Sequence, residues 1–362
     1  MKWLKRILFV LLVPVGAFLL FLAWATLADY KPPEQIPAET SGTGRRVDLS
    51  DSIFSITTWN LGYFGLGKDC DFFFDGGTMT RPSKEQYRQY SEGVLDYLEK
   101  QENTDFYFFQ EVDVYSKRSH FDNQVEKLKT LFNRMESSFA YNYIVPFVIV
   151  PATNPMGKVN SGILSFSAFH TTENTRYAFP TSYAWPVNLM QLDRCFMLSR
   201  VQLAGGKELV LINTHNEAFD DGSQRRKQLA VLKELMLAEY EKGNFVVVGG
   251  DWNQNPVGFG DLAIGRLDDL AIWRFGDLDV GRRIEPAIEA DFLPGDWQWV
   301  FDPSLPTNRD VDAPYERGKT KTTIIDFFVV SPNVEVIQVK TTDIGFEWAD
   351  HQPVEMKFKL LF

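Results

Sequence analysis

The sequence predicts an α/β fold, a four-layer α/β sandwich in which two packed mixed β-sheets are flanked by helices. Short apolar runs typical of strands alternate along the chain with amphipathic stretches typical of helices. Some runs are joined by turn signals and others are separated by a helix-length segment, so antiparallel and parallel pairs are both expected. Short polar segments stand at the ends of these runs, where open α/β sheets keep their ligands.

Three amphipathic stretches predict helices. The first begins after Pro82, where Ser83 and Gln86 form a capping-box pattern, and continues to about residue 100. The second spans about 121–135, and the third spans about 223–242.

Apolar runs predict the strands, and two of the connections carry turn signals. Gly205-Gly206 predicts a hairpin, and Ser331-Pro332-Asn333 predicts a turn. The expected strands are 53–57, 106–109, 140–150, 162–166, 196–203, 208–212, 245–248, 323–330, 334–340 and 354–360.

One catalytic domain is expected after a short N-terminal region. Residues 1–6 form a basic flank, and residues 7–28 form an uncharged apolar stretch that can cross a hydrocarbon core of about 30 Å as a helix. Residues 29–45 are rich in proline and small polar residues, so we interpret them as a linker. Residues 46–362 contain no second linker and no repeat, and we assign them to one catalytic domain.

The apolar stretch 7–28 has two possible interpretations. The basic flank favours an uncleaved transmembrane signal-anchor with the catalytic domain outside the cytoplasm. A cleaved signal peptide usually has an apolar region of only about 7–15 residues. However, Ala23-Trp24-Ala25 is a usable cleavage site, and cleavage there would release a secreted or periplasmic protein.

Composition limits the class of partner. The 362 residues carry a formal net charge of -11, which argues against a surface built mainly to grip nucleic acid. A metal site can nevertheless neutralise a phosphate locally. Cys70 and Cys195 are the two cysteines, and we expect separate, partly buried thiols, although pairing stays open because it depends on their geometry. We expect the chain to act as a monomer.

Six polar segments contain the residue types of a catalytic site, namely carboxylates, amides and imidazoles. They are Thr58-Trp59-Asn60-Leu61-Gly62, Gln110-Glu111-Val112-Asp113, Asn213-Thr214-His215-Asn216, Gly249-Gly250-Asp251-Trp252-Asn253, Ile325-Asp326-Phe327 and Ala349-Asp350-His351-Gln352-Pro353.

Two of these residues suggest a metal site. Glu111 follows four aromatic residues and Gln110, and a carboxylate leaving a buried strand must be paired or metal-bound. Asn60 offers a neutral amide at the end of the first strand. Oxygen ligands of this kind suit Mg²⁺ or Mn²⁺. Taken singly, a surface glutamate and a turn asparagine are the alternatives.

The remaining segments suggest proton transfer. His215 and His351 are two of only four histidines, and a neutral imidazole can take a proton from water and later donate it. Asp251 and Asn253 are two residues apart, so in an extended segment they would face the same side. Asp326 lies among apolar residues, which predicts that it pairs with an imidazole or another polar group.

In this order the segments resemble the signature of the endonuclease/exonuclease/phosphatase superfamily, which has a DNase I-like fold, over about residues 52–362. The most specific matches are Gly250-Asp251-Trp252-Asn253 and Asp350-His351-Gln352-Pro353. The resemblance implies metal ligands for Mg²⁺, with Mn²⁺ possible in its place: Glu111, assisted by Asn60 and Asp350.

The resemblance also implies catalytic roles for residues around the metal. Asp251 would orient or activate water, and Asn253 would bind the scissile phosphate. His351, paired with Asp326, would be the base or the phosphate-stabilising imidazole, and His215 would lie near the leaving group.

The expected function is therefore divalent-metal-dependent hydrolysis of a phosphate ester, of phosphodiesterase or phosphatase type, by in-line attack of an activated water. The substrate is a lipid headgroup, a small ester or a nucleic acid. A nuclease acting on DNA or RNA is the alternative among enzymes, and a membrane-tethered inactive binding module is the alternative of another class. Residues 256–297 form either a substrate-shaping loop or a surface excursion.

Overall fold

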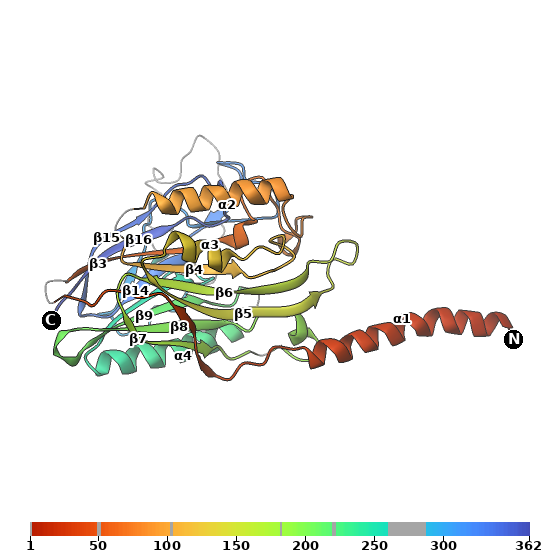
Figure 1. The fold of residues 1–362 in the computed structure, drawn as a ribbon, viewed down its shortest axis with the longest axis horizontal. Coiled ribbons are helices and arrows are strands. Elements are labelled where there is room, and N and C mark those ends of the chain that lie inside the picture. Colours follow the sequence, from red (N-terminus) through yellow and green to blue (C-terminus); the bar gives the residue numbers. More distant parts are fainter. Residues whose placement is uncertain (1, 49–51, 102–103, 182, 219–221, 260–286) are drawn as a thin grey trace.

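The computed structural model describes residues 2–48, 52–101, 104–181, 183–218, 222–259 and 287–362. In this part of the chain two seven-stranded sheets pack face to face, with helices on their outer faces (Figure 1). The predicted four-layer α/β sandwich of two mixed sheets is confirmed.

The first sheet has the spatial order β15-β16-β3-β4-β6-β5-β2, and β3 and β4 are parallel to each other. Its strands are β2 (Glu39–Ser41), β3 (Ile53–Asn60), β4 (Phe106–Asp113), β5 (Glu136–Val148), β6 (Gly157–Ser167), β15 (Val334–Thr341) and β16 (Val354–Leu360).

The second sheet has the order β1-β7-β8-β9-β10-β14-β11, and β9 and β10 are parallel. Its strands are β1 (Gln35–Pro37), β7 (Thr171–Ala178), β8 (Cys195–Gln202), β9 (Glu208–His215), β10 (Phe245–Asp251), β11 (Gln298–Val300) and β14 (Asp326–Val330). A separate two-stranded ladder joins β12 (Asn308–Arg309) to β13 (Thr322–Thr323).

The parallel pairs determine where the polar segments lie, because the carboxyl ends of parallel strands meet at one edge of a sheet. Asn60 at the end of β3 is aligned with Gln110 of β4, and His215 at the end of β9 is aligned with Asp251 of β10. Helix α2 (Lys84–Glu99) connects the first pair, and α4 (Ser223–Glu241) connects the second. Each connection is thus a strand-helix-strand crossover.

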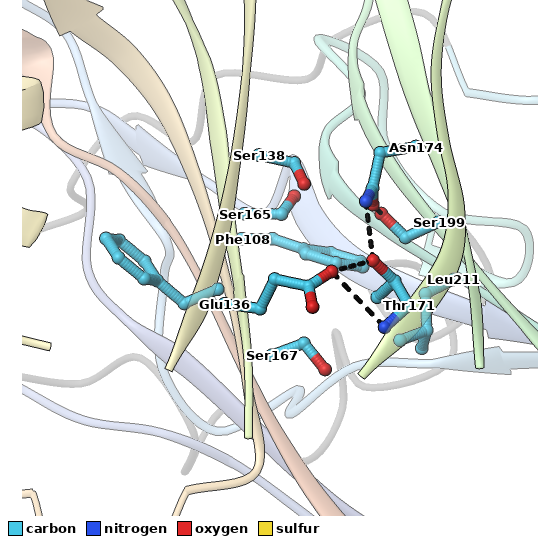
Figure 2. A pocket seen from close by; sticks show the side chains of 10 residues that line it. Phe108, Glu136, Ser138, Ser165, Ser167, Thr171, Asn174, Ser199 and Leu211 are labelled. Atoms are coloured by element: carbon cyan, nitrogen blue, oxygen red, sulfur yellow. Dashed lines mark hydrogen bonds between the residues drawn. The ribbon is translucent and has the colours of Figure 1, made fainter. Parts of the chain in front are cut away.

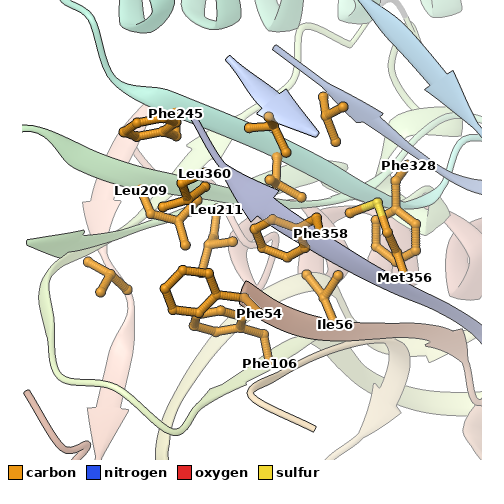
Figure 3. Close-up of a cluster of buried hydrophobic side chains, with 14 of the residues drawn as sticks. Phe54, Ile56, Phe106, Leu209, Leu211, Phe245, Phe328, Met356, Phe358 and Leu360 are labelled. Carbon is orange, nitrogen blue, oxygen red and sulfur yellow. The ribbon is translucent and has the colours of Figure 1, made fainter. Parts of the chain in front are cut away.

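Apolar side chains fill the space between the layers. Phe54 and Phe106 of the first sheet pack with Phe328 of the second in the central cluster (Figure 3). Val94 of α2 belongs to the cluster on the outer face of the first sheet, and Leu232 of α4 belongs to the cluster on the outer face of the second. Burial of one such side chain stabilises a fold by about 1.5–3 kcal/mol.

The predicted helices are present. At α2 the Ser83 Oγ accepts a hydrogen bond from the Gln86 backbone N–H at 3.2 Å, and the Gln86 Oε1 accepts from the Ser83 N–H at 3.0 Å. The second helix, α3 (Gln124–Leu131), is shorter than predicted because Asn123 caps it, its Oδ1 accepting from the Glu126 N–H.

The predicted strands are also present, with one interruption. The run 323–330 divides into β13 and β14, because the Ile324 carbonyl accepts from the Asn255 side chain and the Ile325 N–H donates to Thr307 Oγ1. The hairpin at Gly205-Gly206 joins antiparallel β8 and β9. Strand β7 was not predicted, since its sequence TTENTRYA lacks an apolar run.

Residues 29–45 are not a free linker, which corrects the sequence prediction. Strand β1 pairs with β7 at the edge of the second sheet, and β2 pairs with β5 at the edge of the first. Pro37 is tolerated because an edge strand can lack one N–H donor. This segment therefore joins both sheets through backbone hydrogen bonds, which its polar, proline-rich composition did not suggest.

Helix α1 (Lys2–Leu27) covers most of the predicted anchor at 7–28. Its last turns pack on the domain, where Leu22 and Ala25 contact Leu189 and the Trp185 Nε1–H donates to Thr26 Oγ1 at 3.1 Å. Several side chains before residue 12 lie outside the described part. Among the described residues no helix is both long and apolar enough to cross a membrane.

Most of the segment 256–297 cannot be compared with its prediction, because 260–286 lie outside the described residues. Its C-terminal part is described: Ile288, Phe292 and Trp297 pack into the apolar cluster that also contains α4 side chains. The described part of the segment is therefore packed against the rest of the domain.

A small polar pocket interrupts the interior between the sheets (Figure 2). The Glu136 carboxylate points toward Thr171, whose backbone N–H donates to Oε1 at 3.2 Å, and Glu136 Oε2 lies 3.0 Å from His170 Nδ1. Because the buried carboxylate has these partners, we interpret the pocket as structural.

The two cysteines are separate, as the sequence favoured. Cys70 and Cys195 are both free and buried. Burial raises the pKa of each thiol to about 11, so both stay protonated near neutral pH.

Candidate active site

Asp251 lies at the centre of a polar cluster formed by the ends of the parallel strands. Its Oδ2 accepts from Asn60 Nδ2 at 2.9 Å and lies 3.5 Å from His215 Nε2 and 3.8 Å from His351 Nε2. Its Oδ1 accepts from the Asn253 backbone N–H at 3.0 Å. The carboxylate is buried and held by donors from both sheets, so its orientation is fixed.

His351 and Asp326 form the pair that the sequence predicted. The His351 Nδ1 lies 2.8 Å from Asp326 Oδ2, and Asp326 is fully buried at the start of β14. When Nδ1–H donates to the carboxylate, Nε2 is the atom that faces Asp251, and Asn308 Nδ2 lies 2.9 Å from it. The bond to Asp326 favours a proton on Nδ1 and holds the plane of the ring.

Charge around His351 favours its protonated form. Burial lowers the pKa of the imidazole, but the carboxylates of Asp326, Asp350 and Asp251 outweigh that effect and raise the pKa to about 10. A divalent cation bound beside these carboxylates would oppose the rise, because it neutralises part of their charge.

Glu111 leaves the sheet at a bulge. Its φ is 55°, and the register between β4 and β6 shifts between Phe109 and Val112. Bulges re-aim a side chain, and here Glu111 Oε1 comes to 3.5 Å from Asn60 Nδ2. Its other oxygen lies 3.8 Å from Arg118 Nη1.

Asp350 completes the predicted metal side of the site. Its Oδ1 is buried and has no hydrogen-bond partner among the described residues. Burial raises the pKa of Asp350 to about 6, and the charge of Glu111 adds to the rise while His351 opposes it. A Cβ atom at Gly62 would lie 2.7 Å from Asp350 Oδ1, so the turn after β3 passes directly against this carboxylate.

These three residues fit a hard divalent cation. Glu111 and Asp350 offer carboxylate oxygens, and Asn60 offers its Oδ1, which also accepts from the Gly62 N–H at 3.0 Å. A buried carboxylate oxygen without a donor, such as Asp350 Oδ1, is costly unless a cation compensates it. Asp251, Asp326 and His351 form a second group whose ligand atoms lie within 4.8 Å of one another. Because His351 Nδ1 is already bonded to Asp326, that group fits a hydrogen-bonded relay better.

Asn253 adopts a different geometry from the one predicted. It has φ 50°, so it lies in a left-handed turn after β10 and not in the extended segment that the sequence predicted. Its Nδ2 donates to the Asn216 carbonyl at 2.9 Å, and its backbone N–H bonds Asp251. An amide has two N–H donors, and among the described residues the Asn216 carbonyl is the one acceptor found for Nδ2.

His215 is buried beside Asp251, with no partner on Nδ1 among the described residues. Burial lowers the pKa of its imidazole well below the ordinary value, and the nearby charges of Arg194, His351 and Arg118 lower it further. His215 is therefore a neutral imidazole.

Sequence reasoning missed several residues of the site. Asn308 comes from the short strand β12, and no signal in the sequence marks it. Arg118 is buried and binds Asp113 through two hydrogen bonds of 3.0 and 2.9 Å. Gln110 and Asn213 were in the polar segments without a role, and their side chains join the two sheets by a bond of 2.7 Å.

Comparison with known proteins identifies the family. The model of the Endonuclease/Exonuclease/phosphatase family matches residues 57–345, and the chain belongs to this family. Its members are phosphoester hydrolases. No curated protein matches the chain.

Solved structures share the fold at low identity. An endonuclease/exonuclease/phosphatase from Beutenbergia cavernae is 16% identical with a TM-score of 0.54, over 85% of this chain and 72% of that chain. ANGEL2, a 2',3'-cyclic phosphatase, is 14% identical with a TM-score of 0.52, over 90% of this chain and 99% of that chain. D. rerio TDP2, complexed with a single-strand DNA product, is 17% identical with a TM-score of 0.50, over 85% of this chain and 100% of that chain.

Proposed function

We propose that the protein is a divalent-metal-dependent phosphoesterase that cleaves a phosphate ester by in-line attack of an activated water. The observation that carries the proposal is the fixed position of Asp251, which is bonded to Asn60 and lies beside both His215 and His351. Such a group of oriented polar side chains at the carboxyl ends of strands suits proton transfer next to a bound anion.

Mg²⁺, or Mn²⁺ in its place, held by Glu111, Asn60 and Asp350, would supply charge neutralisation and polarisation of the phosphate. Within the chain itself, Asp251 orients the attacking water through Oδ2. The proton of that water passes to Asp251 while protonated His351 stabilises the phosphate, or it passes to Nε2 of His351 once a bound cation has opposed the rise of its pKa. In the second case Asp326, 2.8 Å from Nδ1, stabilises the imidazolium.

Two further side chains complete the scheme. Asn253 donates its second Nδ2–H to a phosphoryl oxygen, while its first bond to the Asn216 carbonyl keeps the amide in place. His215, a neutral imidazole whose Nε2 lies 3.5 Å from Asp251 Oδ2, lies near the leaving group and donates a hydrogen bond to the leaving oxygen.

The substrate class is tested by a hydrolysis panel with plasmid DNA, sphingomyelin, phosphoinositides and bis(p-nitrophenyl) phosphate. We expect hydrolysis of at least one ester with Mg²⁺ and loss of that activity in EDTA. A nuclease would cleave the plasmid preferentially, although a net charge of -11 weighs against an extended nucleic-acid surface. No hydrolysis of any ester would favour the inactive binding module.

The placement of the catalytic domain outside the cytoplasm rests on the sequence alone. N-terminal sequencing of the mature protein tests the cleavage alternative. Protease added outside intact cells tests the placement, because a domain that is cut only after the cells are opened would contradict it. A mature chain that begins at Thr26 would establish a cleaved signal peptide.

A further inference from the structure

The turn after β3 holds a tyrosine in a strained conformation beside the metal side of the site. Tyr63 has φ 45° and Phe64 has φ 54°, in the left-handed region that bulky residues rarely adopt. Tyr63 is 1% exposed, and its carbonyl accepts a hydrogen bond from Gln124 Nε2 at 2.6 Å. Strain that the surrounding structure maintains in this way is concentrated at functional sites.

Arg118 fixes the ring of Tyr63. The guanidinium carbon lies 3.8 Å from the ring centroid, and the same guanidinium is held by two hydrogen bonds to Asp113. Arg118 Nη1 also lies 3.8 Å from Glu111 Oε2. One cation therefore touches both the tyrosine ring and the predicted metal ligand, so ring and ligand are positioned together.

The hydroxyl of Tyr63 is buried and has no hydrogen-bond partner among the described residues. Burial raises the pKa of Tyr63 well above its ordinary value, Arg118 opposes the rise, and the charges of Glu111 and Asp350 add to it. The hydroxyl is thus a protonated donor that is affected by the charge of both carboxylates. A buried donor without an acceptor is costly, so an acceptor brought by a ligand would stabilise it.

We propose that the Tyr63 hydroxyl donates a hydrogen bond to an oxygen of the substrate phosphate held between Glu111 and Asp350. The inference rests on the proposed function, because it assigns a phosphate to that position. The rival explanation is that Tyr63 is structural and contributes only its ring to the packing against Arg118.

Tyr63→Phe separates the two explanations, because it removes the hydroxyl and keeps the ring. The matched control is Tyr143→Phe. Tyr143 is also buried near Arg118, with its ring centroid 5.9 Å from the guanidinium carbon, but its hydroxyl donates to the Met190 carbonyl at 3.3 Å. Calorimetric titration with inorganic phosphate, with and without Mg²⁺, gives the affinity, and thermal unfolding of the metal-free proteins gives the stability.

We expect Tyr63→Phe to weaken phosphate binding in Mg²⁺ by about 10- to 100-fold, as loss of a hydrogen bond to a charged group does. Its melting temperature without metal and its Mg²⁺ affinity should match wild type. Tyr143→Phe should lower the melting temperature and leave phosphate affinity unchanged.

Unchanged phosphate affinity in Tyr63→Phe would overturn the inference, and so would an equal loss in both variants. Failure of the proposed function would look different. In that case the wild-type protein would hydrolyse no ester, whereas a Tyr63-dependent affinity for phosphate would still support the binding position.

Discussion

The most quantitative prediction concerns the loss of activity when the hydrogen-bonded pair of His351 and Asp326 is changed. The hydrogen bond to Asp326 Oδ2 is 2.8 Å long, both residues are buried, and Asp326 Oδ1 has no partner among the described residues. Asp326→Asn can no longer stabilise a positive imidazole, and His351→Ala removes the proton carrier. General acid–base groups contribute about 10²–10⁴-fold, so each variant should lose kcat/KM on that scale. This loss corresponds to about 2.7–5.4 kcal/mol of transition-state stabilisation.

A double-mutant cycle tests whether the two residues act as one unit. The double variant should be within about threefold of His351→Ala, because the first change has already removed the shared function. Asp105→Asn is the matched control. Asp105 precedes β4 at the end of the strand away from the site, and its carboxylate accepts two hydrogen bonds from Ser55 of β3. The loss of kcat/KM in the double variant of Asp105→Asn and His351→Ala should equal the product of the two single losses. Multiplicative losses for Asp326→Asn and His351→Ala would refute the pairing.

Two further predictions concern stability. Burial is the main cause that raises the pKa of Asp193 to about 7 from 3.8, so the folded state keeps a proton that the unfolded state releases between these values. Stability should therefore fall as pH rises from about 4 to about 7 and then level off. Asp193→Asn should remove this fall in urea unfolding curves, and parallel curves for both proteins would contradict it. Gly250→Ala should destabilise the fold by about 1–3 kcal/mol or more, because its Cβ would lie 2.0 Å from the Thr214 carbonyl oxygen. Gly295→Ala, where nothing lies within 4 Å, is its control, and equal melting temperatures for both variants would refute the steric argument.

Much of the fold could be predicted from local signals. The capping box at Ser83 is a strong signal for a helix start. The apolar runs of β3, β4, β9 and β10 are strong signals for strands, because buried central strands tolerate few polar residues. Strands β1, β2 and β7 lie at or near the sheet edges, where pairing depends on backbone hydrogen bonds and not on apolar side chains. For that reason the segment 29–45 was interpreted as a linker.

The site was predictable where residue type and strand end coincide. Asp326 among apolar neighbours predicted a partner, and His351 is that partner. Asn308 and Tyr63 could not be predicted, because their contacts join segments far apart in the chain. The left-handed turn at Asn253 also depends on tertiary contacts, namely its bonds to Asp251 and Asn216.

The central claim is that Glu111 belongs to a metal site required for phosphate-ester hydrolysis. Its most direct test is a Mg²⁺ titration of bis(p-nitrophenyl) phosphate hydrolysis after chelation, with wild type and Glu111→Gln side by side. Glu111→Gln keeps the shape and removes the charge, so we predict saturable activation of wild type and a variant that needs far more Mg²⁺ and turns over at least about 100-fold more slowly. Equal turnover and equal Mg²⁺ dependence in the two proteins, or full activity after chelation, would contradict the claim.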